Sequence, residues 1–406
     1  MCLSSEQRSR FTSGCSDGWC RVYLQRSLGI DQLPKKCCLS VHFSDIPQNF
    51  VMHLLNSRIN SLVFLLAFLA ACSTGIVIGE EPQILKEPQI LKVSSEEAVA
   101  SDYSHQRAVE FLDRTAMAWT NKYKCFTCHT NFAHLIAVSE LEQRPEYFQK
   151  VRNSLNELVQ TRWQEKGPRW DAEVVMAAMT LTLVDRNLSE PLSQNATLAL
   201  EKMWEVQQSD GGFDWLKCDW PPMESDDEYG AVVAAVAVSA APRTYLRQKQ
   251  VQSGIARLEN YLSQSRKQQL RLHHRAILLW AQSLKPGWMT QQEIDSTVAE
   301  LTALQRPDGG WNTPSLGKWD REDGGIPDVM TSDGYGTGFA ILMLTKAGLK
   351  PDNAVIQAGL NWLKKNQRQS GRWYTRSVSR DSRHFLTHAG TAMALMALQA
   401  SGEAEN

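Results

Sequence analysis

Three segments of the chain repeat one plan, and this repetition restricts the possible folds more than any other feature. They run Gln207-Gln-Ser-Asp-Gly-Gly-Phe213, Gln305-Arg-Pro-Asp-Gly-Gly-Trp311 and Gln367-Arg-Gln-Ser-Gly-Arg-Trp373. Each glutamine ends a stretch with helical apolar spacing, and a helix of small and apolar residues follows each copy, at 229–241, 335–347 and 389–400. The plan predicts a glycine C-cap, an aromatic side chain that packs back on the turn, and a closely packed inner helix.

The chain from residue 103 to 399 is predicted to be helical throughout. Segments of 13 to 18 residues with helical apolar spacing alternate with short polar or Gly/Pro breaks, and no convincing strand alternation appears. Twelve helices in pairs close naturally into six inner and six outer helices, so the expected fold is an all-α α/α toroid. The predicted spans are 104–120, 129–144, 147–164, 171–186, 194–208, 226–241, 249–264, 270–284, 290–305, 332–347, 353–367 and 383–400.

The Gln-x-x-Asp-Gly-Gly-Trp elements resemble the QW motifs of squalene-hopene cyclases and other members of the terpenoid cyclase and protein prenyltransferase toroid superfamily. The resemblance covers roughly residues 201–400 and extends weakly back to residue 103. It implies one barrel domain at 103–402, in which these elements are structural. The cyclases close their cavity between two barrels, whereas this chain has length for one. A second subunit or a narrower substrate is therefore expected.

The N-terminal part is predicted to direct export. The apolar run 61–71 is too short for the roughly 20 residues that span a bilayer, and it is typical of a signal peptide. A natural signal peptide would begin at Met52, so residues 1–51 are interpreted as a wrongly annotated or disordered extension. Leu69-Ala-Ala-Cys72 matches a bacterial lipobox with lipidation at Cys72; an ordinary cleavage site nearby is the alternative.

Residues 73–102, which include the repeat EPQILKEPQILK, are predicted to be a linker between the signal peptide at 52–72 and the barrel. The mature protein is thus expected to be a bacterial periplasmic protein or membrane-anchored lipoprotein. The 43 basic and 44 acidic residues of the full chain are nearly balanced and form no long basic run, so no nucleic-acid partner is expected.

An acidic segment follows the first repeat, where the hopene cyclases carry Asp-x-Asp-Asp-Thr-Ala. Glu224, Asp226 and Asp227 match the three acids, and Asp226 matches the general acid that protonates a terminal alkene in that family. Such an acid must stay neutral, which clustered carboxylates in a poorly solvated cavity favour. Glu224 replaces the first Asp, and Glu228-Tyr-Gly replaces Thr-Ala. The alternative is structural, with a Ser225-x-x-Glu228 capping box and the two aspartates in the first helical turn.

Further candidates are expected at the same mouth of the barrel, because inner helices begin at one end. The predicted substrate-binding residues are Trp215, Trp220, Tyr229, Asp333, Tyr335 and His388. Four of these are aromatic side chains suited to stabilising a cation through their ring faces. The alternatives are caps and hydrogen-bonded core positions, which suit Ser332 and the pair His384 and His388.

Lys124-Cys-Phe-Thr-Cys-His-Thr130 is the most specific short motif. Cys-x-x-Cys-His attaches c-type haem through two thioethers, here at Cys125 and Cys128, with His129 as an axial iron ligand. Predicted export is consistent with haem c, and the candidate sixth ligands are His105, Met117 and His134. A disulfide or redox pair and a zinc site stay open.

Two functions follow from these observations. The first is an exported enzyme resembling the triterpene cyclases, an isomerase that starts by protonating an isoprenoid alkene; it predicts an apolar cavity lined by aromatic residues. The second is a non-catalytic binding or electron-transfer barrel that carries haem c; it predicts a shallow polar mouth and acids used as helix caps. A prenyltransferase ranks last, because a basic diphosphate-binding cluster and its zinc ligands are absent from the sequence.

Overall fold

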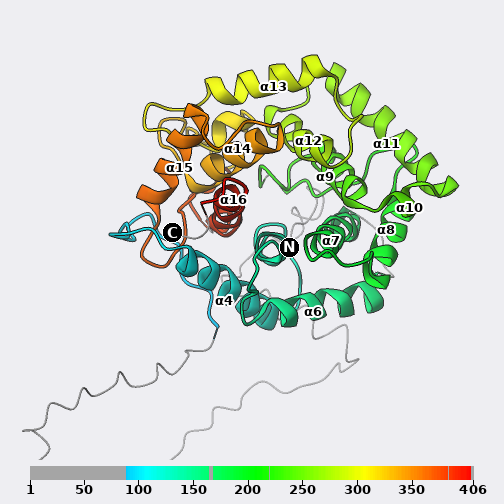
Figure 1. The fold of residues 1–406 in the computed structure, drawn as a ribbon, viewed down its shortest axis with the longest axis horizontal. Coiled ribbons are helices and arrows are strands. Elements are labelled where there is room, and N and C mark those ends of the chain that lie inside the picture. The colour runs from blue at the N-terminus through cyan, green and yellow to red at the C-terminus, as the bar shows by residue number, and fades with distance from the viewer. Residues whose placement is uncertain (1–87, 164–167, 219, 383, 404–406) are drawn as a thin grey trace, which may run out of the picture. The chain divides into compact units, whose positions relative to one another are not determined.

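The computed structural model describes residues 88–163, 168–218, 220–382 and 384–403, and these form an all-helical ring (Figure 1). The six inner helices are α5 (Asn131–Ser139), α7 (Pro168–Asn187), α9 (Asp227–Ala240), α12 (Leu272–Leu284), α14 (Gly334–Lys346) and α16 (Leu386–Ala400). The six outer helices are α4 (His105–Tyr123), α6 (Phe148–Thr161), α8 (Gln194–Val206), α11 (Lys249–Lys267), α13 (Gln291–Ala303) and α15 (Ala354–Asn366). All twelve predicted helices and the α/α toroid are confirmed. The additional elements are the one-turn helix α10 (Arg243–Leu246) and the 3₁₀ helix η3 (Pro314–Leu316).

The inner helices form a closed ring because each packs against the next one. In order around the ring, α5 contacts α7, α7 contacts α9, α9 contacts α12, α12 contacts α14, α14 contacts α16, and α16 contacts α5. In α9, which has neighbours all round, every residue from Tyr229 to Ala240 is buried. Small residues allow the close approaches, for example where Gly338 of α14 faces the backbone of Ala394 in α16. None of the helices in the described ranges is both long and apolar enough to cross a membrane.

Each of the three repeated glutamines joins the end of one outer helix to another outer helix. At the end of α8, the Gln207 amide donates to the carbonyl oxygens of Gly211 and Gly254, the latter in α11. Gln305 likewise links the end of α13 to Val355 in α15. In the second and third copies the indole N–H donates back to the preceding outer helix, from Trp311 to Leu301 and from Trp373 to Leu363, both at 2.7 Å. The predicted packing of the aromatic residue is thus confirmed in these two copies.

The third copy closes the ring between the last outer helix and the first. Gln367 is buried, and its side chain donates to the Ser104 carbonyl at 2.8 Å and accepts from the Ser104 N–H at 2.7 Å. Ser104 is the N-cap of α4. Residues 263 positions apart therefore meet at this joint.

The end of the predicted linker lies against the same joint. Ala100 donates from its backbone N–H to Gln367, and Gln369 donates to Ala98. The Arg372 guanidinium contacts the Glu97 carboxylate and the Lys92 carbonyl. The contacts of the barrel therefore begin before residue 103, because these backbone groups and charges find partners at the third repeat. The predicted signal peptide and the lipidation site Cys72 lie outside the described residues and stay predictions.

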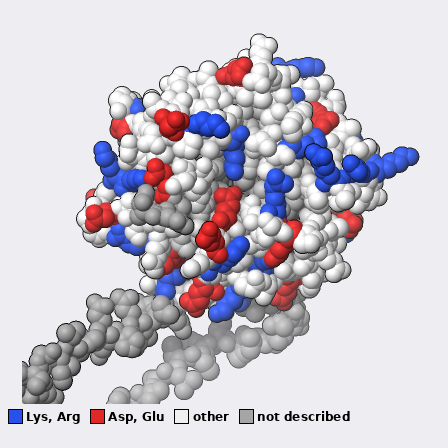
Figure 2. Space-filling view, viewed as in Figure 1, with Lys and Arg blue, Asp and Glu red and all other residues white. Residues whose placement is uncertain are grey.

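Basic and acidic side chains are intermingled over the face seen in Figure 2. This distribution follows from the near equality of 43 basic and 44 acidic residues in the sequence.

Candidate functional site

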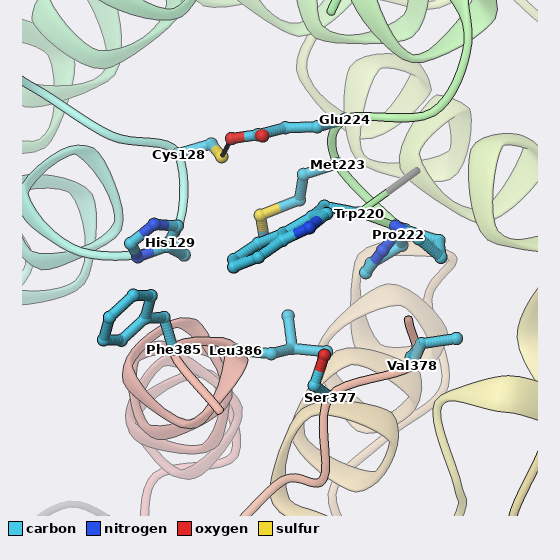
Figure 3. Close-up of a pocket in the computed structure, with 11 residues that line it drawn as sticks. Cys128, His129, Trp220, Pro222, Met223, Glu224, Ser377, Val378, Phe385 and Leu386 are labelled. Carbon is cyan, nitrogen blue, oxygen red and sulfur yellow. Dashed lines mark hydrogen bonds between the residues drawn. The ribbon is translucent and has the colours of Figure 1, made fainter. Parts of the chain in front are cut away.

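A cavity lies where the N-terminal ends of several inner helices meet. His129 precedes α5, Glu224 precedes α9, and Phe385 is the N-cap of α16. The cavity volume is about 30 Å³. Most of the residues around it are apolar or aromatic (Figure 3). The described residues that line it are Cys128, His129, Trp220, Pro221, Pro222, Met223, Glu224, Ser377, Val378, Phe385 and Leu386.

Glu224 is the carboxylate in the wall of this cavity. It ends a tight turn in which Trp220 and Glu224 pair through two backbone hydrogen bonds, and two prolines, with a cis bond between them, occupy the tip. The turn brings Glu224 toward Cys128, whose thiol donates to Oε1 at 3.1 Å (Figure 3). Burial raises the pKa of Glu224, and the thiol offsets only part of that effect. A neutral carboxyl is therefore favoured here more than at an ordinary surface glutamate.

Asp226 has a different environment, although it is only two positions away. It is the N-cap of α9, and its Oδ1 accepts from the Tyr229 N–H and from His274 Nε2 at 2.7 Å. Its Oδ2 accepts from Ser225, and Arg271 lies 3.4 Å away. Burial by itself would raise the pKa of Asp226, but the hydrogen bond and charge of His274 outweigh it and lower the pKa. The carboxyl is thus ionised near neutral pH, contrary to the neutral acid predicted from sequence.

Asp227 faces another direction. Its Oδ1 accepts from the Trp215 N–H at 2.9 Å, and its Oδ2 pairs with Lys217 at 3.0 Å near the surface. The predicted cap also differs in detail: the N-cap is Asp226 and not Ser225, because the Asp226 carboxylate reaches the free N–H of Tyr229. The three matched acids therefore form no cluster within one cavity.

A chain of hydrogen bonds runs inward from Asp226 through two histidines that sequence reasoning missed. His274 Nδ1 lies 3.1 Å from His273 Nδ1, and His273 Nε2 lies 2.9 Å from the Tyr335 hydroxyl. Burial lowers the pKa of His273 and raises that of Tyr335, so both are neutral at pH 7. With the charge on His274 that lowers the pKa of Asp226, the contacts are satisfied when His274 donates to both Asp226 and His273, and His273 donates to the Tyr335 hydroxyl. The chain has the geometry to pass a proton between the mouth and the interior. The only signal in the sequence was two adjacent histidines beside a helix start.

The other predicted substrate-binding residues, apart from Trp220, have structural partners. Trp215 is buried and donates to the Met223 carbonyl, and Tyr229 packs between Trp215 and His273. Asp333 caps α14 and accepts four hydrogen bonds from Thr313, Gly336 and Thr375; burial, the larger effect, raises its pKa to about 6. Trp220 lines the cavity.

Aromatic rings surround His129 and His388 beside the cavity. The His129 ring stacks on Phe385, with centroids 5.3 Å apart, and meets the edge of Trp119 at 5.0 Å. Thr130 Oγ1 bridges the two imidazoles, 2.7 Å from His129 Nδ1 and 3.0 Å from His388 Nδ1. Burial lowers the pKa of each histidine to about 3, so both are neutral.

The predicted haem does not fit the described arrangement of Cys125, Cys128 and His129. Haem c needs both sulfurs at one porphyrin edge, with the imidazole over the iron. Here Cys128 and His129 line the cavity, but Cys125 does not. Burial raises the pKa of the Cys125 thiol, and the charges that also act on that pKa are those of Arg162, Arg169 and Glu173. The Cys128 thiol is bonded to Glu224, and two aromatic side chains pack on His129.

The structure also differs from the disulfide and zinc interpretations of the motif, and from the proposed sixth ligands. Cys125 and Cys128 are both free thiols, and the described residues contain no group of three or more His, Cys, Asp or Glu side chains suited to a metal ion. None of His105, Met117 and His134 lines the cavity, and His134 bonds to the buried Asp113 at 2.9 Å.

Asp226→Asn should lower the free energy of unfolding by about 2 kcal/mol at pH 7, because it removes a hydrogen-bonded charge from beside His274. Asn keeps the N-cap oxygen, so the cap itself survives. A carboxyl with a lowered pKa stabilises the fold above its unfolded value, about 3.9, and this contribution is lost as the pH falls through the folded pKa. The difference from wild type should therefore shrink at pH 3. Urea unfolding at both pH values measures it, and an equal loss at both would contradict the ionised state.

Comparisons with known proteins relate part of this chain to the terpene cyclases. The model of the squalene-hopene cyclase C-terminal domain matches residues 277–383. A squalene–hopene cyclase from Bradyrhizobium diazoefficiens is 30% identical over 127 residues, which are 29% of this chain and 16% of that enzyme. The match thus covers far less than two thirds of the relative. The repeats at Gln305 and Gln367 lie inside the family match, in agreement with the resemblance predicted from sequence.

Solved structures show likeness at low sequence identity. The type II terpene cyclase MstE from Scytonema is 15% identical, with 74% of this chain and 97% of that chain covered and a TM-score of 0.47. The ent-copalyl diphosphate synthase from Streptomyces platensis is 13% identical, with 67% and 50% covered and a TM-score of 0.45. These likenesses assign no activity to this chain.

Proposed function

We propose that this barrel isomerises or cyclises a short isoprenoid alkene, and that Glu224 supplies the proton that starts the reaction. The observation that carries the proposal is a carboxyl with a raised pKa in the wall of a mostly apolar cavity. Protonating an alkene requires a neutral carboxylic acid, and a poorly solvated wall favours that form. The squalene-hopene cyclase match at 277–383 supports the reaction class.

Glu224 is a better candidate than Asp226 for the proton donor. The family match does not include residues 224–227, so the choice depends on the geometry of this chain. Glu224 lines the cavity, whereas Asp226 does not and is held as an anion by His274. Asp226, which matches the family's acid by position, is then the ionised end of the chain of hydrogen bonds that leads to Tyr335.

The cavity is small in this structure. Ligand pockets typically measure about 300–1,000 Å³, whereas the cavity volume here is about 30 Å³, so we propose that lining side chains such as Trp220 and Phe385 move aside to admit a short chain. Trp220 and Phe385 present aromatic surfaces to the bound chain, where a developing cation gains from a ring face. A short chain would also remove the need for a second barrel, although a second subunit stays a prediction.

The test is product analysis in deuterated water. The full-length protein is incubated with geraniol, farnesol, geranylgeraniol and squalene, and products are examined by gas chromatography and mass spectrometry. We expect an isomer of one of the shorter chains that carries one deuterium at the protonated carbon. Heat-denatured protein is the control. No new isomer and no deuterium from any of the four probes would refute the proposal.

A further inference from the structure

We propose that the Cys-x-x-Cys-His segment belongs to the wall of this cavity, where the Cys128 thiol positions the Glu224 carboxyl, and that it does not attach haem. The inference deepens the proposed function, since it concerns the same acid. It assigns a role to the Cys-x-x-Cys-His motif, which the proposed reaction does not use. In this role Cys128 is a positioning residue, because it acts on the substrate only through Glu224.

The geometry of the two cysteines differs in the way this role requires. Cys128 and Glu224 stand 96 positions apart in the chain, yet the thiol donates to Oε1 at 3.1 Å across the cavity wall. Figure 3 shows the pair at one side of the cavity, with His129 beside it. Cys125 is three positions earlier and outside the lining. The motif therefore places one sulfur on the acid and the other away from it.

The surroundings of the pair explain why a thiol is suited to this position. The backbone of Glu224 is fixed by its pairing with Trp220, but a glutamate side chain has several free torsions. The thiol is a weak, neutral donor of small size, so it holds one carboxyl oxygen without bringing a charge beside the acid. His129 lines the same cavity as this pair. Burial raises the pKa of the Tyr229 hydroxyl, and Cys128 and Glu224 raise it further, so Tyr229 also lies close to them.

The first experiment measures the coupling between the two side chains without any substrate. The unfolding equilibrium constant of the full chain is determined in urea for wild type, Cys128→Ala, Glu224→Ala and the double variant. We expect the effect of Cys128→Ala to differ by about fivefold to tenfold between the wild-type and Glu224→Ala backgrounds, since contacting residues couple and Ala, unlike Gln, removes the acceptor. The same cycle with Cys125→Ala is the matched control and should be additive. Additivity in both cycles would overturn the proposal.

The second experiment addresses the haem. The chain is produced in a host that matures c-type cytochromes, and a pyridine haemochrome assay is run on the purified protein and on a Cys125→Ala, Cys128→Ala variant. We expect no covalent haem in either. Haem present in the wild type and lost from the variant would refute the inference. Neither measurement depends on turnover, so the proposed reaction and this inference are tested separately.

If the reaction is observed, kinetics separate positioning from general structural damage. Cys128→Ala should lower kcat about tenfold with little change in KM, and Cys128→Ser should restore most of kcat, because a hydroxyl also donates to the carboxyl. Cys125→Ser should leave both constants unchanged. Equal losses for Ala and Ser at position 128 would contradict positioning by a hydrogen bond.

Discussion

Glu224→Gln is expected to reduce the formation of deuterated isomer by about a thousandfold, because an amide cannot donate the proton that a general acid provides. Gln preserves the shape of the side chain and can still accept from the Cys128 thiol, so the cavity should persist. The measurement is the initial rate of product formation with the best of the four isoprenoid probes. Binding of the substrate should change little, and the loss should appear in kcat.

Two neighbouring acids provide matched controls for this result. Asp227→Asn removes a half-exposed carboxylate that pairs with Lys217, and it should leave the rate within about threefold. Asp226→Asn is decisive between two assignments. If Asp226 is the acid, as its position in the motif predicted, this variant loses the activity and Glu224→Gln retains it. That outcome would refute Glu224 as the proton donor.

The pH dependence should follow the same residue. The active form of Glu224 is protonated, so kcat should be highest below its pKa and fall as the pH rises through it. Because burial raises that pKa, the fall should occur at a higher pH than the usual value of a glutamate, about 4.3. A rate that rises with pH across this range would indicate that an ionised carboxylate is required instead.

The fold was predictable because its determinants are local and repeated. Each helix has its own apolar spacing, and each of the three glutamine segments indicates where an outer helix ends. The predicted glycine C-cap was wrong, because the C-cap of α13 is Leu304 and Gly309 lies in the turn that follows, where its φ is +89°. The sequence did not predict the hydrogen-bond partner of each glutamine side chain. The contact from Gln367 to Ser104 joins opposite ends of the domain, and only closure of the ring reveals it.

The site was less predictable, since the properties of an acid depend on residues far away in the chain. Glu224 and Asp226 look equivalent in sequence, but one meets Cys128, 96 positions earlier, and the other meets His274, 48 positions later. The first partner leaves the pKa of Glu224 raised, and the second lowers that of Asp226. The role proposed for the Cys-x-x-Cys-His segment could not be predicted for a similar reason, because spacing alone does not show that Cys128 lines the cavity and Cys125 does not.

Gly371→Ala should lower the free energy of unfolding by about 3 kcal/mol or more. Gly371 has a φ of +92°, and an added Cβ would overlap the Arg107 carbonyl of α4. The matched control is Gly348→Ala, where φ is +103° and no atom lies within 4 Å of the added carbon. Gly348→Ala should cost only the backbone strain, about 1 kcal/mol. Urea unfolding of both variants separates strain from overlap, and equal losses would show that α4 does not approach this turn so closely.

The same measurement reports whether the ring unfolds as one unit. The Gly371 turn lies at the joint where Gln367 meets Ser104, so relieving the overlap requires α4 to move away from α15. If closure is needed for cooperativity, the variant should lose α4 before the rest, and the slope of free energy against urea should fall as well as the midpoint. If the remaining inner-ring contacts suffice, the slope stays constant and only the midpoint shifts. The contact of α16 with α5 bridges the same joint from inside. We therefore expect the slope to be maintained and the stability to be lost.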